Sequence, residues 1–197
     1  MRANYLAALL AAIALLRIPA LAAVTELPKV MVIATGGTIA GEQRGTAALS
    51  GYDIRKSVTE IVAAVPDLRK YAQIETEQFL NIPSTNMTPE YWLQLSRRVS
   101  ELLSKRTDLN GIVITHGTDR LEETAFILHI TVKSSKPVVL VGAQRPLNGI
   151  SPDGPLNLLS AVRVATSPDA NGKGVMIVMD QRILSARDAE KRYARSG

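Results

Sequence analysis

A glycine-rich turn that carries two threonines is the most chemically suggestive feature of the chain. Thr35 and Thr38 flank Gly36-Gly37, directly after the apolar run Val-Met-Val-Ile-Ala at 30–34. A threonine hydroxyl becomes a nucleophile when a nearby base accepts its proton, and glycine N–H groups can hold a developing oxyanion. We interpret Thr38 as the candidate nucleophile and Thr35 as the less favoured one. Taken by itself, the turn is more typical of threonines that only bond to nearby backbone.

A second turn of similar chemistry follows another apolar run. Residues 115–119 read Thr-His-Gly-Thr-Asp and come after Ile-Val-Ile at 112–114. Asp119 is a candidate base for a threonine and a candidate partner for a substrate ammonium group; Tyr52 or a lysine could also serve as the base. A helix N-cap is the alternative role for Asp119. We interpret His116 as structural, because it lies just inside the end of an apolar strand.

Composition excludes several classes of site. The chain has no cysteine and only two histidines, and no cluster of acidic and histidine ligands occurs, so we predict no metal and no cofactor. The turn at 36–41 lacks the dinucleotide and P-loop spacings, which leaves nucleotide binding as a weak third hypothesis. The net charge is only +5 and no basic stripe is interleaved with aromatic residues, so nucleic acid is not an expected partner.

Apolar strands alternate with amphipathic helices after the first strand. This alternation predicts an α/β fold with a doubly wound, mostly parallel sheet and helices on both faces. Because the carboxyl ends of parallel strands share one edge, the turns after the first, third and fourth strands should converge on one crevice. The expected strands are 30–34, 71–80, 111–115, 137–141 and 174–179.

Capping residues indicate where two helices begin. Ser57 with Glu60 predicts a capping box, and Thr88-Pro89 predicts the next helix start, whose buried face should carry Trp92, Leu93, Leu95, Val99, Leu102 and Leu103. Two further helices are expected over 121–130, with Ile130 on the apolar face, and over 156–164. We expect 41–51 to be a polar loop and 180–197 a polar, basic end segment.

The first 22 residues have the pattern of a secretory signal peptide. Met1-Arg2 precedes an apolar run at 5–16, and Ala20-Leu21-Ala22 gives a small-x-small site. We predict cleavage after Ala22 or Ala23, a mature domain over 23–197 and a periplasmic location. A membrane anchor is disfavoured, because the apolar run falls short of the ~20 residues that span a bilayer.

Several motifs in order resemble the bacterial L-asparaginase family, in its periplasmic type II branch. The resemblance runs from about residue 28 to residue 191. The motifs are Ala-Thr-Gly-Gly-Thr-Ile-Ala at 34–40, Ile-Thr-His-Gly-Thr-Asp at 114–119, Glu-Glu-Thr-Ala at 122–125, Lys-Pro-Val-Val at 136–139, Val-Gly-Ala-Gln-Arg-Pro at 141–146, Asp-Gly-Pro-Leu-Asn-Leu at 153–158 and Ala-Arg-Asp at 186–188.

The resemblance implies a role for each matching residue. Thr38 matches the nucleophile that forms an acyl-enzyme, and Tyr52 matches the tyrosine that helps activate it. Thr118, Asp119 and Lys191 match a second threonine with its aspartate–lysine partners. The implied substrate contacts are Ser84, Thr85, Gly117, Thr118 and Asp119, with Thr85 standing where many relatives carry Gln or Glu.

The implied activity is hydrolysis of L-asparagine to L-aspartate and ammonia, with L-glutamine as an open second substrate. The family's fold is Rossmann-like, its assembly is a homotetramer, and its members carry a second, smaller domain. The chain matches only an N-terminal domain that we expect to be incomplete at its C-terminal end. An inactive remnant or an amino-acid-binding module is therefore the alternative function.

Overall fold

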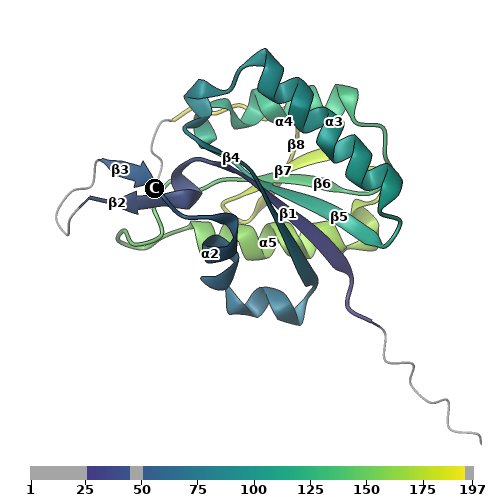
Figure 1. The fold of residues 1–197 in the computed structure, drawn as a ribbon, viewed down its shortest axis with the longest axis horizontal. Helices are drawn as coiled ribbons and strands as arrows, with labels where there is room; N and C mark the ends of the chain where they lie inside the picture. The colour runs from purple at the N-terminus through teal and green to yellow at the C-terminus, as the bar shows by residue number, and fades with distance from the viewer. Residues whose placement is uncertain (1–25, 45–50, 194–197) are drawn as a thin grey trace, which may run out of the picture.

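The computed structural model describes residues 26–44 and 51–193, which build a six-stranded sheet between two layers of helices (Figure 1). The signal peptide expected over 1–22 lies outside the described residues. In spatial order the strands are β4 (Gln73–Ile82), β1 (Lys29–Gly36), β5 (Leu109–Thr115), β6 (Val138–Val141), β7 (Val175–Met179) and β8 (Arg182–Ser185).

Five of the six strands are parallel, and their order creates a switch point. β1 pairs in parallel with β4 on one side and with β5 on the other, and the sheet then continues through β6 to β7. Numbered along the chain, the parallel strands therefore lie in the order 2-1-3-4-5. In this arrangement the connections leave β1 and β5 toward opposite faces, so a crevice opens at their carboxyl ends. The predicted doubly wound, mostly parallel sheet is confirmed.

Alternate residues of β1 feed two separate cores. Val30 and Val32 pack with α2 (Val58–Ala63) and α5 (Gly154–Thr166), whereas Met31 and Ile33 pack with α3 (Pro89–Lys105) and α4 (Leu121–Thr131). Because both faces of β1 are buried, residues that point to either face must be apolar. This explains why the sequence of β1 is continuously apolar and does not alternate with polar residues. Figure 1 shows α3 and α4 above the sheet and α2 and α5 below it. None of these helices is long and apolar enough to cross a membrane.

Both predicted helix caps are confirmed. The Ser57 side chain accepts a hydrogen bond from the Glu60 N–H, and the Glu60 carboxylate accepts one from the Ser57 N–H, which completes the capping box. Thr88 caps α3 by accepting from the Tyr91 N–H, and Pro89 occupies the first helical position. These local signals fix where the connections enter each helix.

Four local expectations are wrong. Leu93 is 50% exposed and Ile130 is 60% exposed, because each lies outside the stripe of its helix that faces the sheet. The expected loop at 41–51 begins as β2 (Gly41–Gln43), which forms an antiparallel hairpin with β3 (Tyr52–Ile54). The expected polar end segment contains β8, which pairs antiparallel with β7 at the edge of the sheet.

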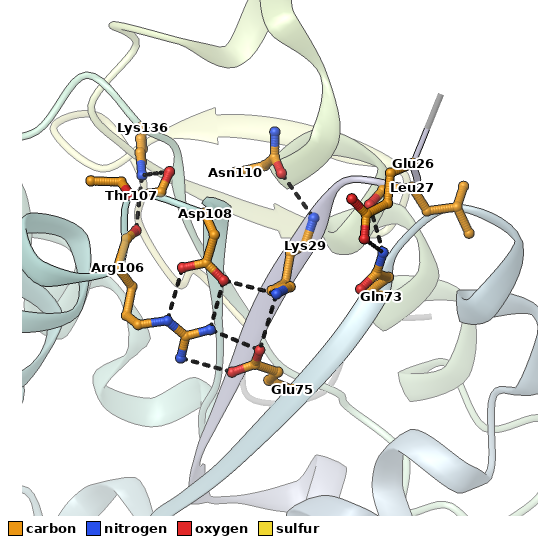
Figure 2. A network of polar contacts seen from close by, with 10 residues as sticks. All are labelled: Glu26, Leu27, Lys29, Gln73, Glu75, Arg106, Thr107, Asp108, Asn110 and Lys136. Atoms are coloured by element: carbon orange, nitrogen blue, oxygen red, sulfur yellow. Dashed lines mark hydrogen bonds and ion pairs between the residues drawn. The ribbon is translucent and has the colours of Figure 1, made fainter. Parts of the chain in front are cut away.

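The amino edge of the sheet carries a cluster of ion pairs, shown in Figure 2. We call Lys29, Glu75, Arg106 and Asp108 the amino-edge cluster. The Lys29 Nζ donates to Asp108 at 2.8 Å, and the Arg106 guanidinium bonds to Asp108 at 2.9 Å and to both Glu75 oxygens at 2.8 and 3.0 Å. These contacts hold the pKa of Asp108 well below its usual range, with the hydrogen bond from Arg106 as the largest cause. The cluster thus joins the starts of β1, β4 and β5.

Replacing Arg106 with methionine tests the amino-edge cluster. Arg106→Met keeps the apolar stem but leaves two carboxylates without their guanidinium, so we expect a lower urea midpoint of unfolding. We expect this deficit to shrink in 1 M NaCl, where the Debye length is about 3 Å. Lys70→Met is the matched control, because Lys70 makes one exposed pair with Asp67. A deficit equal to that of Lys70→Met, or independent of salt, would contradict a role for the cluster.

Candidate active site

The two threonine turns meet backbone to backbone at the switch point. A Cβ placed on Gly37 would lie 2.2 Å from the Gly117 Cα and 2.3 Å from its nitrogen, so neither turn leaves room for a side chain between them. Gly37 also has φ 80°, a left-handed conformation that favours glycine. Its N–H donates to the Ile82 carbonyl at 3.1 Å, so this amide is already occupied and does not face an oxyanion.

Thr38 and Tyr52 form the first polar pair of the site. Thr38 is buried in the short turn η1 (Thr38–Ala40), and its hydroxyl donates to the Tyr52 hydroxyl at 2.7 Å. Tyr52 is the first residue of β3 and reaches Thr38 because the hairpin folds its ring over Gly41. A Cβ on Gly41 would lie only 2.7 Å from the Tyr52 Cδ2. The pair therefore has the hydroxyl-to-acceptor geometry that nucleophile activation requires.

Thr118, Asp119 and Lys191 form the second polar group. The Lys191 Nζ donates to the Thr118 hydroxyl at 2.8 Å and to the Asp119 carboxylate at 2.6 Å. Asp119 lies in η4 (Thr118–Arg120), and α4 begins without a side-chain cap, so the alternative of Asp119 as an N-cap is not what the structure shows. Lys191 is largely buried rather than solvated with the end segment.

Ser84 lies against the same glycine that contacts Gly37. A Cβ on Gly117 would lie 2.6 Å from the Ser84 Oγ, which places this hydroxyl at the meeting point of the two turns. The Oγ is buried, and no hydrogen-bond partner for it occurs in the part of the chain that the structure describes. An unsatisfied buried hydroxyl costs stability, which is typical of a group reserved for a ligand. Thr85 follows in η3 (Ser84–Asn86) and is exposed.

Thr35 and His116 make hydrogen bonds within the protein, which agrees with the structural role that the sequence predicts for His116. The Thr35 hydroxyl donates to the Thr115 carbonyl at 2.9 Å across β1 and β5. His116 is fully buried, its Nδ1 lies 2.7 Å from the Gly117 carbonyl oxygen and its Nε2 lies 3.0 Å from the Thr124 hydroxyl. Burial lowers the pKa of His116 to about 4, so the imidazole is neutral at pH 7.

Glu122 and Asn157 contact residues of the site, although neither is predicted from the sequence to have a role there. The Glu122 carboxylate accepts a hydrogen bond from the Lys191 N–H. The Asn157 side chain donates to the Gly142 carbonyl at 3.0 Å and accepts from the Asp180 N–H at 3.1 Å, which joins the loops after β6 and β7. Glu122 lies four residues after Thr118, and this helical spacing is the one sequence signal that could have placed it beside Lys191.

A groove of about 550 Å³ adjoins Thr118 and Lys191. Glu122, Asp180 and Tyr193 are among its lining residues. Thr38, Tyr52 and Ser84 do not line it. The groove therefore borders only the second polar group, and the reactive arrangement lies where the two turns meet.

The donor set suits covalent acyl transfer by a hydroxyl. The described ranges 26–44 and 51–193 hold no cluster of three or more His, Cys, Asp or Glu side chains placed to bind a metal ion. They do hold two buried hydroxyls, on Thr38 and Thr118: the first donates to the Tyr52 hydroxyl, and the second accepts from the Lys191 Nζ. Such a pair of hydroxyls could attack and then release an acyl group.

Comparison with known proteins agrees with this reading. The family described as "Asparaginase, N-terminal" matches residues 29–196. The chain belongs to the asparaginase family. The Glutaminase-asparaginase of Pseudomonas fluorescens biotype A is 46% identical over 85% of the chain and 46% of the relative. A probable periplasmic L-asparaginase of Haemophilus influenzae is 45% identical over 84% of the chain and 47% of the relative.

A solved asparaginase shares the fold. The crystal structure of a probable cytoplasmic L-asparaginase from Campylobacter jejuni superposes with a TM-score of 0.79 and 44% identity, covering 84% of this chain and 50% of that one. The chain thus spans about half the length of the asparaginase relatives that it matches.

The buried His116 makes stability depend on pH. Its pKa falls from 6.5 in the unfolded chain to about 4 in the folded one, so the unfolded state binds the extra proton between these values. The contribution is complete above pH 6.5 and is lost as pH falls toward 4. We expect wild type to lose roughly 2 kcal/mol more unfolding free energy than His116→Gln between pH 7 and pH 4.5, measured in urea. Equal losses would mean that His116 is not neutral and buried.

Proposed function

We propose that the chain carries the nucleophile-bearing part of an amidohydrolase that converts L-asparagine to L-aspartate and ammonia. The observation that carries the proposal is the pair of hydroxyl groups, Thr38 with Tyr52 and Thr118 with Lys191, held on either side of the Gly37–Gly117 contact. The asparaginase names of the relatives support the substrate class.

In the first half of the reaction the Thr38 Oγ attacks the side-chain amide carbon of the substrate. The Thr38 proton passes to the Tyr52 oxygen along their 2.7 Å hydrogen bond as Tyr52 gives its own phenol proton to the amide nitrogen of the substrate. The C–N bond of the tetrahedral intermediate then breaks, and the nitrogen, which carries that proton, departs as ammonia. The product of this half-reaction is an ester between Thr38 and the β-acyl group of aspartate.

In the second half water attacks that ester. The water gives one proton to the Tyr52 oxygen as Tyr52 gives its own proton to the Thr38 oxygen. The ester C–O bond breaks, and the Thr38 hydroxyl is restored as L-aspartate leaves. The Lys191 ammonium, which bonds to Thr118 and Asp119, gives the second hydroxyl a charged neighbour in this step. We assign Thr118 to holding the attacking water and not to the first attack, because the Lys191 ammonium donates to Thr118 and cannot accept its proton.

The amino-acid head of the substrate has matching partners beside Gly117. The unpaired Ser84 hydroxyl can donate to the α-carboxylate, and the half-exposed Asp119 carboxylate can accept from the α-ammonium. Thr85 and the Gly117 backbone complete this proposed contact set. L-Glutamine is a second proposed substrate, since one relative is named Glutaminase-asparaginase.

Removing the Thr38 hydroxyl tests the proposal. We expect Thr38→Ala to lower ammonia release from L-asparagine by about a thousandfold or more, because the attacking atom is gone. Thr35→Val is the matched control: it removes a threonine hydroxyl from the same strand end but one that only braces Thr115. Activity that survives Thr38→Ala would refute this nucleophile.

Calorimetry with L-aspartate separates the enzyme from a binding module. A chain that binds L-aspartate with measurable heat but releases no ammonia from L-asparagine would refute the amidohydrolase and favour the amino-acid-binding alternative. A chain that does neither would refute both proposals.

We also propose that residues 1–22 direct export and that 23–197 form the exported domain. The relative named periplasmic supports this location, although the solved relative is named cytoplasmic. We expect a bacterium expressing the chain to contain, in its periplasmic fraction, protein that begins at Ala23 or Val24. Leu9→Arg, which breaks the apolar run, should retain the full mass in the cytoplasm. Full-length mass for the wild type would contradict cleavage.

A further inference from the structure

A hydrogen-bonded column crosses from α3 to the turn that carries Thr118. The Trp92 indole N–H donates to the Thr124 hydroxyl at 2.7 Å, the Thr124 hydroxyl lies 3.0 Å from the His116 Nε2, and the His116 Nδ1 lies 2.7 Å from the Gly117 carbonyl oxygen. We call Trp92, Thr124 and His116 the Trp–Thr–His column. His116 and Thr124 have no exposed surface.

The chemistry of the partners fixes the direction of every hydrogen bond in the column. A carbonyl oxygen only accepts, so the His116 Nδ1 must carry the proton that bonds to Gly117. His116 is neutral, so its Nε2 is an acceptor, and the Thr124 hydroxyl must donate to it. The Thr124 oxygen is then free to accept from the indole N–H, which is donor only. Thr124 is therefore the one group in the column that both accepts and donates.

The column ends at the peptide on which the candidate site is built. Gly117 contacts Gly37 through its backbone and lies against the Ser84 hydroxyl. Thr118 follows it directly in the chain. A small rotation of the Gly117 peptide would therefore alter the spacing of Thr38, Ser84 and Thr118 together.

We propose that Thr124 is a positioning residue for the candidate active site, acting through His116 on the Gly117 carbonyl. The proposal rests on the proposed function where it concerns substrate, but its effect on the Gly117 peptide is independent of any activity. Thr124 itself lies in α4 and touches no proposed reacting group.

The same pair of helices provides a matched control. Ser96 on α3 donates to the Thr131 hydroxyl on α4 at 2.8 Å, and Thr131 in turn donates to the Ile127 carbonyl. This contact resembles that of Trp92 with Thr124 in joining α3 to a threonine of α4. It differs in having no connection to the turn at 116–118. Thr131→Val thus removes an interhelical hydrogen bond without touching the column.

The experiment compares Thr124→Val, Thr124→Ser and Thr131→Val in the full chain. Amide resonances of Gly117 and Thr118, the single Trp92 indole resonance and the His116 ring nitrogens are followed by ¹⁵N NMR. We expect Thr124→Val to shift all of them, Thr131→Val to leave those of 116–118 unchanged, and Thr124→Ser to restore them. L-Aspartate affinity should fall about tenfold in Thr124→Val alone, as misplacement of binding groups predicts.

Each outcome decides the proposal. Equal shifts at Gly117 and Thr118 in Thr124→Val and Thr131→Val would reduce Thr124 to helix packing, and unchanged shifts in Thr124→Val would also overturn the inference. Wild-type affinity in Thr124→Val would overturn it while leaving the proposed function intact. If the wild type neither binds nor turns over substrate, the proposed function fails. The amide shifts then remain as the test of whether Thr124 positions the Gly117 peptide.

The wild type supplies a test that needs no folded variant. The fixed direction of the column requires the His116 Nδ1–H tautomer at pH 7. Ring ¹⁵N shifts that show this tautomer would support the column should Thr124→Val fail to fold. Detection of the Nε2–H tautomer would overturn it.

Discussion

Backbone meets backbone where the turn after β1 crosses the turn after β5, and the candidate site depends on this contact. With no side chain at Gly37 or Gly117, the turn that carries Thr38 and the turn that carries Thr118 approach until their backbones touch. A methyl group at Gly37 would overlap the Gly117 backbone, whose neighbours on either side are buried and bonded. The parallel pairing of β1 with β5 brings the strand ends together, but the missing side chains decide how close the hydroxyl groups come.

The two edges of the sheet are stabilised by different physics. At the amino edge, the partly exposed charges of Lys29, Glu75, Arg106 and Asp108 hold three strand starts together, and their interactions are open to screening by salt. At the carboxyl edge, neutral groups such as His116 and Asn157 hold the turns through buried hydrogen bonds, which salt hardly reaches. Buried networks of this kind fix one geometry because each unmade bond is costly. The site is thus built on the edge where position is most narrowly determined.

The sequence predicted the parts of the fold that local physics controls. Val30 to Ala34 is apolar throughout because both faces of β1 are buried. Ser57 and Thr88 are N-cap residues, and their types predicted where α2 and α3 begin. The sequence did not predict features that depend on contacts with residues far away in the chain. Leu93 and Leu95 look alike in sequence, yet only Leu95 faces the sheet, and β8 is short, exposed and held by β7 alone. Thr38 could be singled out from its turn, whereas Lys191 reaches Thr118 from 73 residues away and no local pattern marks it; the family resemblance supplied it. The Trp–Thr–His column was not predicted either, because no local pattern shows that Trp92 and Thr124 are in contact.

Tyr52 enters the site from the β2–β3 hairpin and not from the main sheet. Each strand of this hairpin has three residues, and an isolated two-stranded hairpin is marginally stable in water. Its docking onto η1 is therefore a local equilibrium, separate from the cooperative unfolding of the sheet. On heating, we expect the Thr38 hydroxyl to lose its acceptor before the hydrophobic cores melt, so the Thr38–Tyr52 geometry should end at a lower temperature than the one at which the chain denatures.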